Sequence, residues 1–349
     1  MNLYEQLESI GFPEPLEVAT FRTIAHLFVA TKKRCGVYAL CLPDNRVYIG
    51  QAREVVRRFI QHRRTHATIE GFAFLETKPA ELDEQERLLI RKAERAGIVL
   101  ANVTYATNVV GATDLDAVVS PKQQERWLAD PARVNARSDK GPRVRLPRAQ
   151  RERFRAKFEK FMGLSEVSYG ALVDLDLFIS SCLPFPRATE HAFWSVSCMP
   201  ATNGGERLLC VNAGTMELFV VGYLRSEKPP VTTGAFLNVS KSVLLDGFGG
   251  VRAFKRRYPR VVIREGRGYR DAGDDHLALV VGNQEHLDMQ SLLLDPSVQL
   301  AAATLALRVM RKRPTLYSQY HCQLLVDEAR GAFSRMFDSM IELAGESPP

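Results

Sequence analysis

Apolar residues follow two different periods along the first hundred positions of the chain. Short apolar runs bounded by turn residues are typical of strands, and a Pro-Asp-Asn sequence at 43–45 joins two of them into a predicted hairpin. Longer stretches with apolar residues three and four positions apart are typical of helices. The predicted elements are, in order, strands at 36–42 and 46–50, a helix at 53–66, a strand at 72–76, a helix at 82–96 and a strand at 98–103. We therefore expect a compact unit of helices and strands over 35–116.

The residues on either side of this unit are less regular. Residues 1–34 predict one or two short leading helices. Proline and glycine interrupt the apolar pattern from 111 to 140, which predicts a loop-rich segment. A basic helix with phenylalanines along one side is predicted from 147 to 161. We assign 117–164 to a basic linker and helix.

The C-terminal half returns to a strand pattern. Five apolar runs separated by glycine and proline lie between 191 and 282, and helical spacing follows at 298–313 and 317–344. This order predicts a second α+β domain over 165–349, with an antiparallel sheet and two terminal helices. The fold class expected for the whole chain is therefore α+β.

Composition excludes several classes of protein. The chain has 349 residues, 46% hydrophobic and 25% charged, which is usual for globular proteins of two domains. No stretch of about 18 apolar residues is present, and the first residues lack a basic and then apolar signal pattern. We expect a cytoplasmic protein that does not bind membranes.

Positive charge is concentrated in one segment. Residues 133–160 contain eleven basic and three acidic residues, a net charge of +8, whereas the whole chain carries +7 and the remainder therefore −1. A basic stripe on a near-neutral protein is typical of polyanion binding, although a solvated linker would have the same composition. A smaller basic cluster lies at 253–270. The candidate nucleic-acid-binding residues are Arg143, Arg145, Arg148, Arg151 and Arg153.

The predicted hairpin and the helix after it carry candidate catalytic groups. Tyr38 and Tyr48 lie on the two hairpin strands, and Arg58 and His62 are four residues apart on one side of the helix. A guanidinium can bind phosphoryl oxygens in a fork, and histidine, with a usual pKa of about 6.5, can transfer protons at neutral pH. This combination indicates a pocket for a reacting phosphate.

Glu86 is a second anomaly, because it lies on the apolar side of the predicted helix 82–96. Leu82, Leu89 and Ile90 occupy the neighbouring positions on that side. A buried carboxylate is costly unless it is paired or binds a metal. A buried ion pair with an arginine would explain it, and so would Mg²⁺, which is bound by few carboxylates together with water and substrate phosphate.

These residues resemble the GIY-YIG nucleases. Gly-Val-Tyr at 36–38 and Tyr-Ile-Gly at 48–50 stand for the two clusters that name the family, and the later positions lie within a residue or two of family spacing. The resemblance covers about 35–105. It implies a small domain with a three-stranded antiparallel sheet flanked by helices, which cuts phosphodiesters with one divalent metal ion. The matched positions are Tyr38, Tyr48, Arg58, His62, Glu86 and Asn102.

The resemblance also implies a role for each position. Glu86 would bind the metal, Mg²⁺ or Mn²⁺, and Arg58 would hold the scissile phosphate. Tyr38 or Tyr48 would activate or position the attacking water. Asn102 would hold the local structure or bind near the phosphate.

The chain departs from several family members at one position. Gln51 follows the Tyr-Ile-Gly cluster where those members carry lysine. A mechanism in which that lysine lowers the tyrosine's pKa is therefore in doubt for this chain. His62 occupies a position at which some members have histidine and others tyrosine.

The sequence thus predicts a metal-dependent DNA endonuclease with an N-terminal catalytic domain and a C-terminal domain for target selection. Restriction, phage defence and mobile-element biology are all compatible with this prediction, and so is a homo-oligomer. Two alternatives remain open. One is a repair or RNA nuclease, and the other is a nucleic-acid-binding or interaction protein with a regulatory or vestigial nuclease domain.

Overall fold

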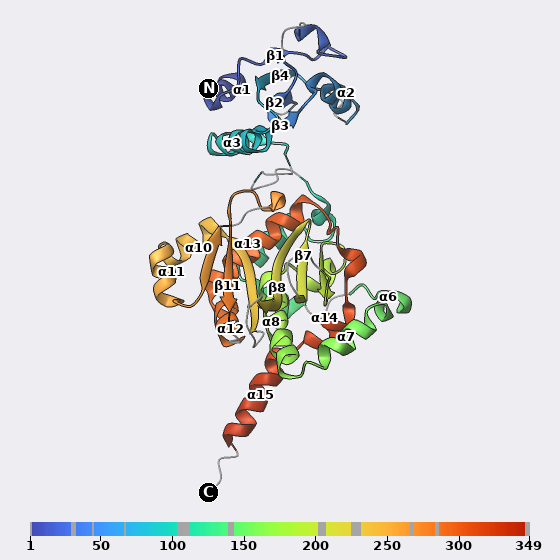
Figure 1. Ribbon diagram of the computed structural model, residues 1–349, viewed down its shortest axis with the longest axis vertical. Helices are drawn as coiled ribbons and strands as arrows, with labels where there is room; N and C mark the ends of the chain where they lie inside the picture. Colours follow the sequence, from blue (N-terminus) through green and yellow to red (C-terminus); the bar gives the residue numbers. More distant parts are fainter. Residues whose placement is uncertain are drawn as a thin grey trace. The chain divides into compact units, whose positions relative to one another are not determined.

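The chain forms two compact units, residues 1–111 (unit 1) and 112–349 (unit 2), in a computed structural model (Figure 1). The leading residues 1–34 thus fold with unit 1. The segment 117–164 folds with unit 2, although the sequence pattern had indicated a linker. The structure describes residues 2–28, 33–43, 45–65, 68–102, 106, 112–138, 143–201, 207–224, 232–265, 269–282 and 286–345.

Unit 1 contains a five-stranded sheet in the order β1-β4-β2-β3-β5. Its centre is the antiparallel set β4-β2-β3, and β1 and β5 add two residues each at the edges, β5 running parallel to β3. The expectation of a three-stranded sheet is therefore wrong in strand number, because short edge pairings extend the central three strands. The strands are β1 (Leu16–Glu17), β2 (Gly36–Leu42), β3 (Arg46–Ala52), β4 (Gly71–Glu76) and β5 (Val99–Leu100).

Side chains alternate between the two faces of this sheet, as the pleat of a strand requires. Val37 and Ile49 belong to a core shared with α1 and α3, whereas Tyr38 and Leu40 belong to a second core shared with α2. The two cores cover the two faces of β2, and this strand is therefore buried along its whole length. The second leading helix is only a 3₁₀ turn. The helices of unit 1 are α1 (Leu3–Ile10), η1 (Ala25–Leu27), α2 (Val55–Thr65) and α3 (Leu82–Arg95).

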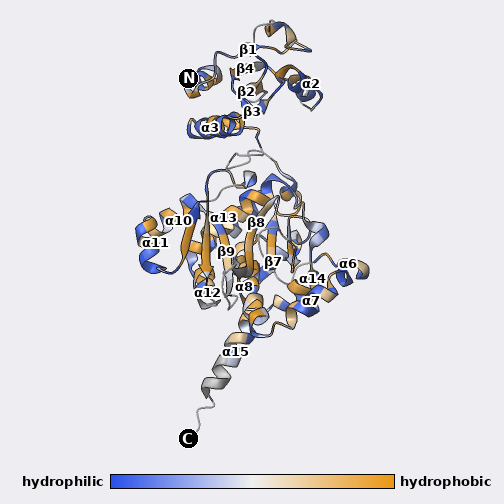
Figure 2. Ribbon diagram, viewed as in Figure 1, coloured by the Kyte–Doolittle hydropathy of each residue, from blue (hydrophilic) through white to orange (hydrophobic). Residues whose placement is uncertain are grey.

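Unit 2 is built on a six-stranded antiparallel sheet in the order β10-β11-β9-β8-β7-β6, with α8 and α13 against one face (Figure 1). The central strand β9 was not predicted, because its sequence TTGAFLNVS dilutes the apolar alternation. The apolar colouring of β7, β8 and β9 marks the centre of the sheet (Figure 2). The strands are β6 (Trp194–Cys198), β7 (Arg207–Ala213), β8 (Met216–Leu224), β9 (Thr232–Ser240), β10 (Val262–Glu265) and β11 (His276–Gly282).

The helices of unit 2 correct two predictions. Residues 112–138, the described part of the segment expected to be loop-rich, are mostly helical. Pro121 and Pro131 each begin a helix, where proline is well tolerated, and Ser120 forms a capping box with Gln123. Residues 111, 139 and 140 lie outside the described residues. The predicted helix 317–344 is broken at Gly331, whose φ of 73° lies in the left-handed region. The helices are η2 (Asp114–Ala117), α4 (Pro121–Ala129), α5 (Pro131–Ser138), α6 (Arg148–Glu152), α7 (Arg155–Met162), α8 (Glu166–Cys182), α9 (Pro186–Thr189), α10 (Lys241–Phe248), α11 (Val251–Arg257), η3 (Arg270–Ala272), α12 (His286–Leu294), α13 (Pro296–Lys312), η4 (Ser318–Tyr320), α14 (Gln323–Ala329) and α15 (Ala332–Gly345).

Among the described residues, no single helix has the length and hydropathy of a membrane span, and one helix pair, Asp288–Leu294 with Pro296–Lys312, meets both criteria only across a 78° bend.

Candidate active site

The hairpin β2–β3 places the two tyrosines on one face of the sheet. Tyr38 lies opposite Gly50 and Leu40 lies opposite Tyr48, so the tyrosines are diagonal neighbours with ring centroids 6.3 Å apart. Glycine is required at Gly50, because a Cβ there would lie 2.6 Å from the Tyr38 Oη. At Gly36 a Cβ would lie 2.2 Å from the carbonyl oxygen of Leu75. The two glycines that flank the paired tyrosines are therefore fixed by close packing.

Helix α2 brings Arg58 and His62 to the Tyr38 hydroxyl. The Tyr38 Oη lies 2.7 Å from the His62 Nε2, and the Arg58 Nε donates to the same oxygen at 3.3 Å. Arginine has no acceptor, so Arg58 can only donate to this oxygen. The tautomer of His62 sets the direction of the other hydrogen bond, and with the ring proton on Nδ1 the Tyr38 hydroxyl donates to Nε2. The His62 ring also packs on Tyr48, with centroids 4.7 Å apart.

The surroundings of Tyr38 keep its hydroxyl protonated. Burial raises the pKa of Tyr38 above its usual value, and the neighbouring Tyr48 and Glu86 also raise it, whereas Arg58 lowers it. The hydrogen bond with Tyr38 in turn raises the pKa of Arg58, which stays charged. The site therefore holds a charged guanidinium beside a protonated phenol.

Glu86 is on the inner side of α3, as the apolar pattern predicted, and its exposed fraction is only 9%. The Gln51 Nε2 donates to the Glu86 Oε2 at 2.9 Å and to the Asp83 Oδ1 at 2.5 Å. One amide thus holds two carboxylates that are three residues apart on the helix. Sequence reasoning missed Asp83 altogether and noted Gln51 only as a departure from lysine. Their contact joins residues 32 positions apart.

This donor set fits a hard divalent cation. Carboxylate oxygens suit Mg²⁺, which keeps several waters and needs only one or two protein carboxylates together with substrate phosphate. Glu86 would hold the ion, with Asp83 next to it through Gln51. No group of three or more His, Cys, Asp or Glu side chains able to hold a metal occurs in the described part of the chain. A site with few protein ligands is the kind that Mg²⁺ uses.

Asn102 acts on the backbone of β3. Its Oδ1 accepts from the Ile49 N at 2.8 Å, and its Nδ2 donates to the Ile49 O at 2.5 Å. Ile49 lies between Tyr48 and Gly50, so the amide fixes the strand that carries the second tyrosine. The resemblance implied two roles for Asn102, holding the local structure or binding near the phosphate. This geometry supports the first of them. Asn102 is a positioning residue.

We expect Gly50→Ala to lower the free energy of unfolding of unit 1 by about 2 kcal/mol, because the new methyl group would overlap the Tyr38 ring in a fully packed site. Thermal denaturation measures this loss. Gly163→Ala is the matched control, since its Cβ would meet no atom nearer than 3.4 Å. Equal melting temperatures for the two variants would contradict the packing described for Tyr38.

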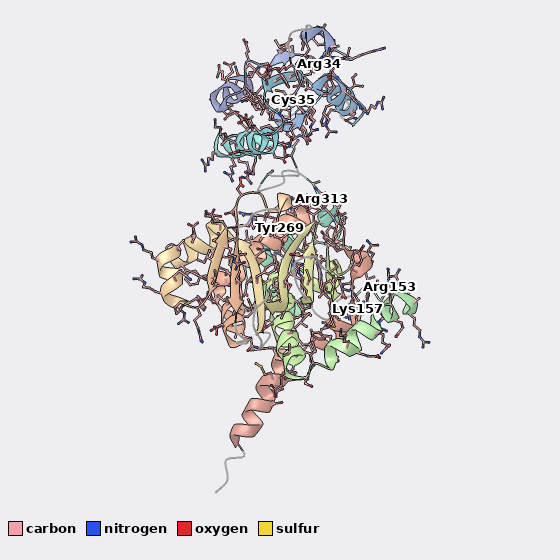
Figure 3. All side chains as sticks on the ribbon, viewed as in Figure 1. Arg34, Cys35, Arg153, Lys157, Tyr269 and Arg313 are labelled. Carbon is pink, nitrogen blue, oxygen red and sulfur yellow. The ribbon has the colours of Figure 1, made fainter. Side chains whose placement is uncertain are left out.

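The five arginines proposed to bind nucleic acid do not share one environment. Arg143 is mostly buried and binds both Glu190 and Asp327. Arg151 binds the same Asp327. Arg145 and Arg148 are exposed, and Arg153 lies over the ring of Phe154, near Lys157 of α7 (Figure 3). Arg143 therefore holds the segment onto unit 2, and its charge is neutralised within the protein.

Glu190 is the buried end of this ion network, and its loss should destabilise unit 2. Burial raises the pKa of Glu190, but hydrogen bonds from Arg143 and His321 more than offset this effect and hold it below its usual value. A carboxyl with a lowered folded-state pKa stabilises the fold above its unfolded pKa, and this contribution disappears as the pH falls. We expect Glu190→Gln to cost about 2 kcal/mol at pH 7.

The difference between wild type and Glu190→Gln should shrink when denaturation is measured in acid, because the wild-type carboxyl is then protonated too. Glu166→Gln, at an exposed position, is the control and should change little. A difference that stays constant from pH 7 to pH 3 would contradict the role of the ionised carboxylate.

Comparison of the chain with family models, with curated proteins and with solved structures finds no match in any of the three. The interpretation of the site therefore depends on its residues and their geometry.

Proposed function

We propose that unit 1 is a GIY-YIG-type endonuclease that hydrolyses phosphodiester bonds of DNA with one divalent metal ion, Mg²⁺ or Mn²⁺. The observation that supports this most is the Tyr38 hydroxyl, which lies between the Arg58 guanidinium and the His62 imidazole. A cation, a phenol and an imidazole in contact are the parts needed to bind a phosphate and move a proton.

The contacts of Tyr38 support a proposed proton path. The attacking water forms a bond to phosphorus and gives its proton to the Tyr38 oxygen, while Tyr38 passes its own proton to His62 Nε2. The raised pKa of Tyr38 makes this coupled transfer necessary, because a free phenolate is disfavoured in the buried site. The bond from phosphorus to the leaving sugar oxygen then breaks, and that oxygen takes a proton from solvent water to become the sugar hydroxyl. Arg58 stabilises the charge that develops on the phosphate oxygens.

Glu86 supplies the carboxylate for the metal, and Gln51 fixes its orientation. A bound Mg²⁺ would polarise the phosphate and stabilise the leaving oxygen. Tyr48 packs on His62 and limits the ring's freedom. We assign target selection to unit 2. A role in binding alone would not need Tyr38, Arg58, His62 and Glu86 to converge, so the nuclease is the better supported function.

A substrate panel tests the proposal. The full-length protein is incubated with duplex, single-stranded and branched DNA and with RNA, each with Mg²⁺, with Mn²⁺ and with EDTA, and the products are resolved on denaturing gels. We expect metal-dependent cleavage of DNA. Cleavage of RNA alone would reassign the substrate, and no cleavage of any nucleic acid with either metal would overturn the proposal.

A further inference from the structure

A uniformly basic stretch of unit 2 lies on α11 and the strand after it. Residues 251–264 contain six basic residues and no acidic residue. They cover α11, a short turn and most of β10. Among the described strands β10 has one neighbour, β11, and so lies at the edge of the sheet (Figure 1). We call these side chains the α11 basic surface. It consists of Arg252, Lys255, Arg256, Arg257, Arg260 and Arg264.

One buried ring fixes the orientation of α11. Phe254 is fully buried and contacts the rings of Phe248 and Tyr258, with centroids 5.1 and 5.4 Å away. Arg252 and Arg256 are two positions before and after Phe254, so they lie on the opposite, exposed side of the helix. Side chains of α11 extend outward from unit 2 (Figure 3), and hydrophilic colouring marks part of the helix (Figure 2).

Half of the side chains of this surface have no partner among the described residues. Lys255 donates to the carbonyl of Val261, Arg257 lies over the Tyr258 ring, and Arg260 binds Asp288. The other three side chains form no ion pair or hydrogen bond with any described residue. These three are the exposed Arg252, Arg256 and Arg264.

The segment with the largest charge differs in this respect. Arg143 and Arg151 bind Asp327, and Arg155 binds Glu152 and Glu159 on its own helix. A phosphate that approached these arginines would have to displace a carboxylate. Net charge along the sequence therefore overstates what 143–155 offers to an external anion. On the α11 basic surface, Arg260 is the one side chain that binds a carboxylate of a described residue.

We propose that the α11 basic surface binds the phosphate backbone of duplex DNA. The identity of the partner rests on the proposed nuclease function. The duplex is favoured over a single strand because single-strand sites stack bases on exposed aromatic rings. Within 251–265, where every residue is described, no exposed aromatic residue occurs, and Tyr258 is engaged with Arg257 and Asp295. The surface thus recognises charge and not bases.

Salt-dependent binding of the full chain tests this assignment. All variants carry Glu86→Gln so that DNA stays intact, and fluorescence anisotropy measures the affinity for a labelled duplex between 50 and 200 mM salt. If Arg252, Arg256 and Arg264 each contact one phosphate, replacing the three with glutamine should flatten the slope of log K against log salt by about 2.7. Between 50 and 200 mM salt, the protein that carries Glu86→Gln alone should then lose about 40-fold more affinity for the duplex than the triple variant.

The matched comparison removes the same number of charges from the other segment. Arg148, Arg151 and Arg155 are replaced with glutamine. Two of these three bind carboxylates within the protein, so we expect a change in slope of less than about 1. The double variant Arg252→Gln/Arg256→Gln, confined to the exposed side of α11, should flatten the slope by about 1.8 and guards against misfolding of the triple variant. Circular dichroism confirms the fold of each.

The outcomes distinguish a failure of the proposed DNA-binding surface from a failure of the proposed nuclease activity. Three results would overturn this inference and leave the nuclease proposal unaffected. The first is an unchanged slope in the α11 variants, and the second is a larger change in slope in the comparison variant. The third is tighter binding to single-stranded DNA or to RNA than to the duplex. Conversely, the expected change in slope together with a wild-type protein that cleaves no DNA would overturn the nuclease and retain the surface. A protein that binds no duplex at 50 mM salt would overturn the inference.

Discussion

Replacing Glu86 with glutamine is expected to lower the rate of DNA cleavage by at least about a thousandfold. Metal ions contribute several kcal/mol of transition-state stabilisation in phosphoryl chemistry, and each 1.36 kcal/mol is a factor of ten in rate. Glutamine has nearly the same shape but no charge, so it can keep the contact with Gln51 while losing affinity for a cation. Single-turnover cleavage on labelled DNA measures the effect.

Two further measurements make this result specific to the carboxylate. Glu84→Gln removes a charge from an exposed position of the same helix and should leave the rate nearly unchanged. The affinity for DNA should also be preserved in Glu86→Gln, since Glu86 is mostly buried and not part of a basic surface. Wild-type cleavage rates in the Glu86→Gln protein would rule out a metal-binding role.

Arg58→Ala should lower the cleavage rate roughly a hundredfold, the effect of removing a charge-assisted contact worth about 3 kcal/mol in the transition state. The loss would have two sources, because Arg58 is proposed to hold the scissile phosphate and it also donates to the Tyr38 hydroxyl. Arg58→Lys keeps the charge but not the planar fork of donors, so it should recover only part of the rate.

The same helix and its start provide controls for Arg58. Arg53 and Arg64 are exposed, and neither contacts the Tyr38 hydroxyl, so their alanine variants should lose far less activity. Equal, modest losses in all three variants would indicate diffuse attraction of DNA by surface charge in place of a defined phosphate site.

The spacing of apolar residues was sufficient to predict strands and helices that depend on neighbouring residues in the sequence. The strand at 36–42 is found at the predicted residues, and the helix at 82–96 differs by one residue at its end. Spacing alone also predicted that Arg58 and His62 point the same way, and the structure brings both to Tyr38. Strand β9 was missed because its position in the centre of a sheet, not its own alternation, buries it.

Contacts between distant residues could not be predicted in this way. Gln51 meets Asp83 across 32 positions, and Arg143 meets Asp327 across 184. Nothing in the local sequence of Arg143 separates it from Arg145, which is exposed. Charge counting therefore found a basic segment, but only the three-dimensional partners show which arginines are neutralised within the protein.

The central claim is that the site formed by Tyr38, Arg58, His62 and Glu86 cuts phosphodiester bonds with a divalent metal. One gel tests it most directly, with end-labelled DNA incubated with the wild-type protein in Mg²⁺, with the wild-type protein in EDTA, and with Glu86→Gln in Mg²⁺. We predict strand breaks with the wild-type protein in Mg²⁺ and intact DNA under the other two conditions. Strand breaks of equal yield in EDTA, or with the Glu86→Gln protein, would contradict the claim.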